Sequence, residues 1–139
     1  MSRALDRAVT GRPGHELALW PTGSVAVVLA AAATTVIAVI GRLRGAPIAI
    51  EGEAIPLIAF PGLTIIGGVA GIALALALAR WTRRPRRTFT ATTVVLTVLS
   101  LVPDLLVQAT ASSKVMLMLT HLVAAAIVIP ALRRRLPAD

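Results

Sequence analysis

Four stretches dominated by apolar residues alternate with shorter polar stretches along the chain. The apolar stretches cover about residues 22–40, 61–79, 88–108 and 115–132 and contain almost no charge. At 1.5 Å per residue, a helix of about 20 residues spans the roughly 30 Å hydrocarbon core of a bilayer. The pattern therefore predicts an all-α fold, an antiparallel four-helix transmembrane bundle that forms a single membrane domain over residues 1–139.

Prolines mark several of the expected helix boundaries. Trp20–Pro21 precedes the first apolar stretch, where an interfacial aromatic residue is typical. Pro61 suits the first turn of the second helix, because its missing N–H needs no partner there. Pro85 should help to end the second helix, and Pro103 should weaken or kink the last turn of the third.

The longest connection, residues 41–60, has a pattern of its own. Arg42 and Arg44 are followed by PIAIEGEAIPLIAF. Apolar and small residues alternate around the central Glu-Gly-Glu, which is compatible with a short β-hairpin or a lid on the membrane surface. Pro47 and Pro56 interrupt strand pairing, so an irregular loop is the favoured interpretation of this connection.

The composition agrees with a membrane protein and narrows its chemistry. The chain is 57% hydrophobic and 14% charged, against about 25% charged residues in soluble domains. It has no cysteine, which excludes disulfides, thiolate metal sites and thiol catalysis. The net charge of +8 comes without a nucleic-acid-binding motif or an aromatic stacking platform, so we expect no nucleic acid partner.

Positive charge is distributed unevenly between the two sides that four antiparallel helices define. One side carries Arg42, Arg44 and Lys114; the other carries both termini and the segment RWTRRPRR at 80–87. Cytoplasmic loops of membrane proteins are enriched in Lys and Arg. We therefore expect a bacterial plasma membrane protein with both termini cytoplasmic. The arginines on that side are Arg3, Arg7, Arg12 and the topology-setting Arg80, Arg83, Arg84, Arg86, Arg87, Arg133, Arg134 and Arg135.

Small residues recur at four-residue intervals in the second predicted helix, at Gly67, Gly71, Ala75 and Ala79. This spacing places them on one smooth helical face where a second helix can approach closely. The face is interpreted either as packing within the same bundle or as a homodimer interface.

A polar stripe runs along the third predicted helix. Its members follow one another at intervals of three or four residues and so share one helical face: Thr90, Thr93, Thr97, Ser100 and Asp104. The hydroxyls can bond to carbonyls of their own helix, so the stripe does not require a pore.

Asp104 and His121 are the two ionisable residues inside the predicted spans. Such residues are costly in a membrane and are therefore functional candidates. An antiparallel hairpin places them about one helical turn apart in depth, near Ser100 and Gln108. Together these residues could relay a proton, hold an ion or orient a polar ligand headgroup. In the structural alternative, Asp104 meets interfacial water and His121 makes one interhelical hydrogen bond.

Sequence motifs of soluble enzymes are absent. The chain contains no P-loop, no Gly-x-Ser-x-Gly and no His-Glu-x-x-His. We therefore expect neither an enzyme nor a cofactor or metal site.

Three segments carry a resemblance: RRPRR at 83–87, SLVPD at 100–104 and MLTHLVAAAIVIP at 118–130. With them, the whole chain resembles a family of small, uncharacterised four-helix integral membrane proteins of high-GC Gram-positive bacteria. The resemblance implies the fold and the location, and no activity.

Two functional hypotheses follow. The first is a module that binds a lipid or another small ligand, or an accessory module that docks a partner membrane protein or a second copy. The alternative is a small oligomeric transporter or an ion- or proton-conducting protein that uses Asp104 and His121. Small multidrug exporters resemble the latter in helix number but carry a carboxylate in the first helix, and Thr22–Ile40 has none.

Overall fold

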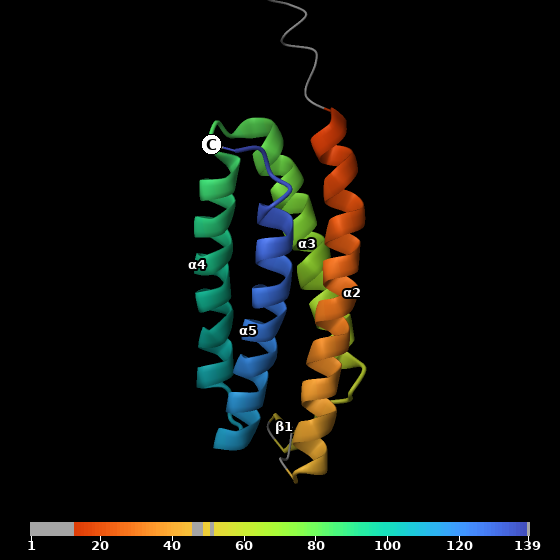
Figure 1. Cartoon of the computed structure of the whole chain (residues 1–139). Coiled ribbons are helices and arrows are strands. Elements are labelled where there is room, and N and C mark those ends of the chain that lie inside the picture. Colours follow the sequence, from red (N-terminus) through yellow and green to blue (C-terminus); the bar gives the residue numbers. More distant parts are fainter. Residues whose placement is uncertain (1–12, 46–48, 51, 139) are drawn as a thin grey trace, which may run out of the picture.

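The computed structural model describes residues 13–45, 49–50 and 52–138, and four long helices run alternately up and down within them (Figure 1). They are α2 (Pro13–Leu43), α3 (Ala59–Trp81), α4 (Pro85–Leu106) and α5 (Ala111–Arg133). All four are long and apolar enough to cross a membrane, which confirms the predicted fold class. Some predictions rest on residues outside the described ones: Arg3, Arg7, Arg12, Pro47, Ile48 and Glu51.

Helix α2 begins much earlier than the apolar pattern predicts. It starts at Pro13, so Trp20 and Pro21 lie inside the helix instead of ahead of it. Proline costs a helix one backbone hydrogen bond. The side chain of Leu19, just before Trp20, is fully buried against the core, and we infer that its burial offsets that cost. The spanning segment within α2 runs from Ala18 to Leu43 and so includes both Trp20 and Pro21.

The other helix boundaries differ by a few residues. Helix α3 has already ended at Trp81, and Pro85 is the first residue of α4, where its fixed φ suits a helix start. Helix α4 continues through Pro103, and its C-cap Val107 donates its amide to the Pro103 carbonyl at 2.9 Å. Helix α5 begins at Ala111, ahead of the expected Val115. Its N-cap hydroxyl, on Thr110, accepts a hydrogen bond from the amide of Ser113 at 3.2 Å.

The connection between α2 and α3 contains a short β-hairpin. Strand β1 (Ala49–Ile50) pairs antiparallel with β2 (Glu53–Ala54), with Ala49 opposite Ala54. Gly52 in the turn has a φ of 86°, a left-handed conformation that glycine adopts without steric cost. The Arg42 guanidinium donates a hydrogen bond to the Ile55 carbonyl, which ties the hairpin to the end of α2. The favoured irregular loop is therefore wrong for this stretch, and the short β-hairpin that the pattern allowed is present.

The hairpin and the arginine-rich connection lie at opposite ends of the bundle (Figure 1). We call the end with β1 and β2 the hairpin end. The arginine end carries the α3–α4 connection and the end of α5, where seven of the eight topology-setting arginines are exposed and Arg86 is partly exposed. A core cluster centred on Leu19, Phe89 and Leu132 extends from the arginine end, and a smaller one at the hairpin end joins Ala38 to Phe60.

The four helices do not pack equally. Helix α2 lies against both α3 and α5 along much of their length, and α4 packs mainly against α5. Helices α3 and α4 contact each other over a shorter part of their length. The bundle is therefore most open on the side between α3 and α4.

The outer surface of the bundle is apolar. Large exposed side chains include Val25, Val28 and Leu29 on α2, and the runs Val94–Leu96 and Val98–Leu99 on α4. Soluble monomers rarely expose contiguous apolar patches larger than a few hundred Å². With four spanning helices, this surface faces lipid, and the protein is a multi-pass membrane protein.

Candidate functional site

A cleft of about 560 Å³ lies between α3 and α4, with α5 on its inner side. We call it the lateral cleft. Helix α3 lines it from Ala59 to Leu74, α4 from Phe89 to Ser100, and α5 from Leu117 to Ile129. It therefore extends from near the hairpin end toward the arginine end.

Small residues of α3 create the space. Gly67 and Gly71 both line the cleft. A Cβ added at Gly67 would meet no described heavy atom within 4 Å, whereas one at Gly68 would lie 2.3 Å from Cγ2 of Val27 on α2. Adjacent glycines therefore have different roles: Gly68 allows α2 and α3 to approach closely, and Gly67 leaves the cleft open.

The predicted small-residue face of α3 is consequently divided between the bundle core and the lateral cleft. Ala75 is fully buried in the core cluster, and Ala79 packs against that cluster from its edge. A Cβ on Gly71 would make ordinary contacts with Leu132 and Val128 of α5. The arginine-proximal part of the stripe thus packs inside the bundle, and its Gly67 end borders the cleft.

The polar stripe of α4 meets the same cleft. Thr93, Thr97 and Ser100 line it. Their hydroxyls donate to carbonyls of their own helix at 2.7–2.8 Å: Thr93 to Phe89, Thr97 to Thr93 and Ser100 to Thr97. Because these donors are engaged, most of the cleft wall is apolar in character.

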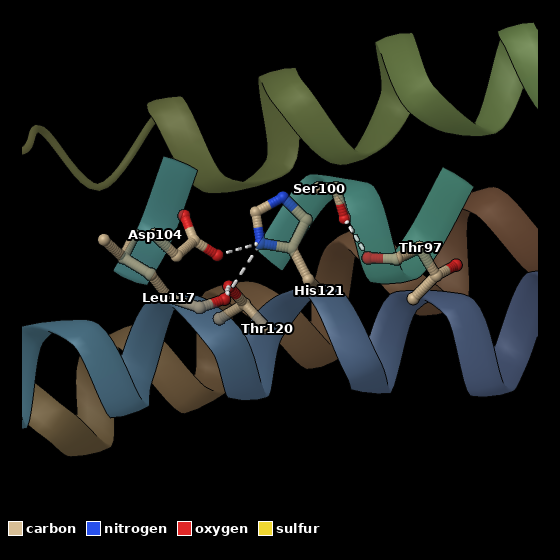
Figure 2. A network of polar contacts seen from close by, with 6 residues as sticks. All are labelled: Thr97, Ser100, Asp104, Leu117, Thr120 and His121. Carbon is tan, nitrogen blue, oxygen red and sulfur yellow. Dashed lines mark hydrogen bonds and ion pairs between the residues drawn. The ribbon is translucent and has the colours of Figure 1, made fainter. Parts of the chain in front are cut away.

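Asp104 and His121 come together between α4 and α5 (Figure 2). Nδ1 of His121 lies 2.9 Å from Oδ2 of Asp104 and 3.0 Å from the carbonyl oxygen of Leu117. The Asp104 side chain is 12% exposed and that of His121 is 44% exposed. Asp104 is thus largely buried beneath the imidazole.

The surroundings of Nδ1 determine which nitrogen carries the proton. Both of its neighbours, a carboxylate and a carbonyl, are acceptors, so Nδ1 must be the protonated nitrogen. Its N–H has hydrogen-bond geometry only toward Leu117, and Oδ2 of Asp104 has no hydrogen bond of good geometry among the described residues. The 2.9 Å contact is therefore electrostatic. It orients the ring so that Nε2 lies on the side turned away from α5 (Figure 2).

The two polar residues expected beside this pair are placed differently. Ser100 lines the lateral cleft together with His121. Gln108 is exposed in the connection beyond the end of α4 and takes no part in the cleft lining. The reason is the early end of α4 at Leu106, which removes Gln108 from the helical face that it was expected to share with Asp104.

Sequence reasoning did not identify the aromatic and aliphatic walls of the cleft. Phe60 and Leu117 form its wall near the hairpin end, and Phe89 lines it on α4. Both phenylalanines of the chain lie there. Because the sequence contains only two phenylalanines, their positions could have been used to predict where the apolar wall of a site lies.

The site does not resemble a metal centre. Within the described residues, no group of three or more His, Cys, Asp or Glu side chains lies close enough to hold a metal ion. Asp104 and His121 provide two ligands at most.

A family model matches residues 15–138, which include all four spans and every residue of the lateral cleft. The chain belongs to the DUF6069 family. This is a family of unknown function. No curated protein and no solved structure matches the chain. Membership in the family therefore supplies no activity.

Proposed function

We propose that the protein binds a single-chain amphiphile in the lateral cleft and acts as a ligand-binding module of the membrane, without enzymatic activity. The observation that carries this proposal is a cleft of about 560 Å³ whose lining contains one ionisable side chain among the described residues, His121. Ligand pockets are typically about 300–1,000 Å³, mostly apolar, with a few placed polar groups.

The shape of the cleft favours an extended apolar chain. Its α3 wall runs from Ala59 to Leu74, about 22 Å along a helix at 1.5 Å per residue. The hydroxyls of α4 that line the cleft donate to carbonyls of their own helix. The apolar chain of the ligand would therefore meet few hydrogen-bonding groups without a partner. The open side between α3 and α4 would let a lipid-like molecule enter from the bilayer.

His121 provides the anchor for the polar head. Protonated at Nδ1, a neutral imidazole presents Nε2 as an acceptor. A hydroxyl or another hydrogen-bond donor on the ligand fits this nitrogen. His121 lies in the half of the cleft nearer the hairpin, beside Ser100 and Leu117, so the head is placed toward that end and the chain toward the arginine end.

The transport alternative uses the same pair, Asp104 and His121. A proton path needs polar groups that can exchange donors and acceptors along the span. The hydroxyls that would extend such a path beyond His121 donate to helix carbonyls instead. This favours binding over conduction.

The arginines support an orientation for the bound molecule. We place the arginine end in the cytoplasm of a high-GC Gram-positive bacterium and the hairpin on the outer face of its plasma membrane. The support is the gathering of eight arginines at one end of the bundle, which is typical of cytoplasmic ends. The ligand head would then lie in the outer half of the bilayer.

Photolabelling tests this proposal. The probe is a long-chain primary alcohol that carries a diazirine at the end of its chain, added to the full-length protein in vesicles. We expect labelled residues on the walls of the lateral cleft, and several-fold weaker labelling by the matching methyl ether, which lacks the donor. Equal labelling by the alcohol and the ether would contradict the role of His121.

Two glycine variants provide a matched pair. Gly67→Phe fills the lateral cleft from a position where an added Cβ meets no described atom within 4 Å. Gly62→Phe is on the same helix, is equally unobstructed, and lies outside the cleft. The first should abolish labelling and the second should leave it unchanged. Labelling that persists in Gly67→Phe would contradict binding in the cleft.

A further inference from the structure

A second hollow lies at the arginine end, on a different face of α3. It has a volume of about 410 Å³ and is lined by Trp20 of α2 and by Ala73, Leu76, Ala77, Arg80 and Trp81 of α3. We call it the tryptophan groove. It shares no residue with the lateral cleft, so it is a separate candidate site.

The two tryptophans line the groove from two different helices. Trp20 is near the start of α2 and Trp81 ends α3, and Figure 1 shows these two helix ends at the same end of the bundle. Their side chains are 55% and 82% exposed. Tryptophan rings concentrate at the headgroup level of membranes, because one edge is polar and the rest is apolar.

Charge makes one end of the groove suitable for an anion. Arg80 lines the groove, and Arg83 and Arg84 follow it within one turn of chain, both exposed. No acidic residue occurs from Arg80 to Arg87. A guanidinium has five N–H donors, so Arg80 can bind phosphate oxygens while keeping another contact.

The apolar floor determines the kind of anion. Ala73, Leu76 and Ala77 lie one to two turns before Arg80 and Trp81, on the side toward the middle of the span. The alanines leave room along the helix surface, and Leu76 offers an apolar contact. A free phosphate would need none of this surface, whereas the first part of an acyl chain would cover it.

We propose that the tryptophan groove binds an anionic phospholipid, with the phosphate at Arg80 and one acyl chain over Ala73 to Ala77 between the two tryptophan rings. Such a lipid would fill the surface between α2 and α3 and hold the arginine end at the membrane surface. The site differs from the lateral cleft in ligand charge and in bilayer depth.

The composition of the chain allows a direct test. Trp20 and Trp81 are its two tryptophans, so intrinsic fluorescence reports on this groove and on no other region. The full-length protein is placed in phosphatidylcholine vesicles that contain increasing amounts of brominated phosphatidylglycerol, and separately of brominated phosphatidylcholine. We expect brominated phosphatidylglycerol to quench the tryptophan fluorescence with an apparent association constant at least twofold higher than that of brominated phosphatidylcholine.

Arginine variants locate the effect. Arg80→Gln should reduce the ratio of the two association constants, phosphatidylglycerol over phosphatidylcholine, to near one. Arg80→Lys should retain part of this preference because the charge remains. Arg135→Gln is the matched control, because Arg135 is exposed at the same end and does not line the groove. It should leave the preference unchanged.

Three outcomes would overturn the proposal. The first is equal quenching by the two lipids. The second is an equal loss of preference in Arg80→Gln and Arg135→Gln, which would indicate diffuse attraction to positive charge. The third is loss of the preference in inorganic phosphate at matched ionic strength, which would assign the groove to a free anion.

Discussion

At the scale of single residues, the lateral cleft depends on which of two neighbouring glycines faces α2. Gly68 meets Val27, and Gly67 meets open space. One hundred degrees of helical rotation separates the two positions, so the same residue type packs one helix pair and leaves another apart. Valine has a stiff χ1, so Val27 cannot turn away easily from a larger residue at 68.

The glycine pair gives the first prediction. Gly68→Ala should destabilise the protein by about 1–3 kcal/mol, the usual cost of overpacking, because the new methyl would lie 2.3 Å from Val27. Gly67→Ala should be neutral or slightly stabilising, since alanine favours a helix. Thermal unfolding in one detergent compares the two. Similar losses of stability in both variants would contradict the different surroundings of Gly67 and Gly68.

The contact between Asp104 and His121 also belongs to this scale. A buried carboxylate needs a partner, and the structure offers it the imidazole at 2.9 Å. The same contact directs Nε2 away from α5, where the proposed ligand head would lie. In the proposed binding mode, Asp104 is a positioning residue and His121 is the residue that touches the ligand head.

At the scale of elements, the hairpin supports the end wall of the cleft. Ile55 and Leu57, which follow β2, pack against the cluster of Ala38 and Phe60, as does Leu117 of α5. Phe60 and Leu117 line the cleft from the other side. The connection between α2 and α3 thus closes the hairpin end of the bundle and is more than a linker.

A disulfide tests the register of the hairpin. Ala49 and Ala54 are directly opposite each other, at a separation that suits a cross-strand bond. Ala49→Cys/Ala54→Cys should form it on mild oxidation, and the chain has no cysteine that could compete. In the control, Ala49→Cys/Glu53→Cys, the side chains lie on opposite faces and should stay reduced. Thiol titration distinguishes them, and the reverse result would show a shifted register.

The elements also show how far sequence reasoning reaches. Charge-free stretches predicted four spans, and the spacing of Asp104 and His121 about a turn hairpin predicted their proximity. The predicted start of the first helix was wrong, because the helix continues through Pro21 and buries Leu19 ahead of it. The cleft was missed because its existence depends on the distance between α3 and α4, which helical periodicity within each helix does not determine.

At the scale of the whole molecule, the protein is an up-and-down bundle whose ends differ in charge. The arginine end carries the exposed arginines of the α3–α4 connection and of residues 133–135. Leu136, which follows them, is buried in the core cluster, and its carbonyl accepts a hydrogen bond from Nε of Arg86 at 2.8 Å. The tail is thereby tied to the start of α4.

Orientation gives a prediction at this scale. Because the chain lacks cysteine, single cysteines report accessibility without background. Glu53→Cys in the hairpin should react with a membrane-impermeant maleimide added to intact cells, and Ala138→Cys should react only after lysis. Both positions are exposed in the structure. Labelling of Ala138→Cys in intact cells would contradict cytoplasmic termini.

The most direct test of the central claim is native mass spectrometry of the protein extracted gently from its own membrane. We expect a defined additional mass on the wild type and on Gly62→Phe, and its loss from Gly67→Phe, in which the lateral cleft is filled. A wild-type protein without additional mass, or an additional mass that persists in Gly67→Phe, would contradict ligand binding in the cleft.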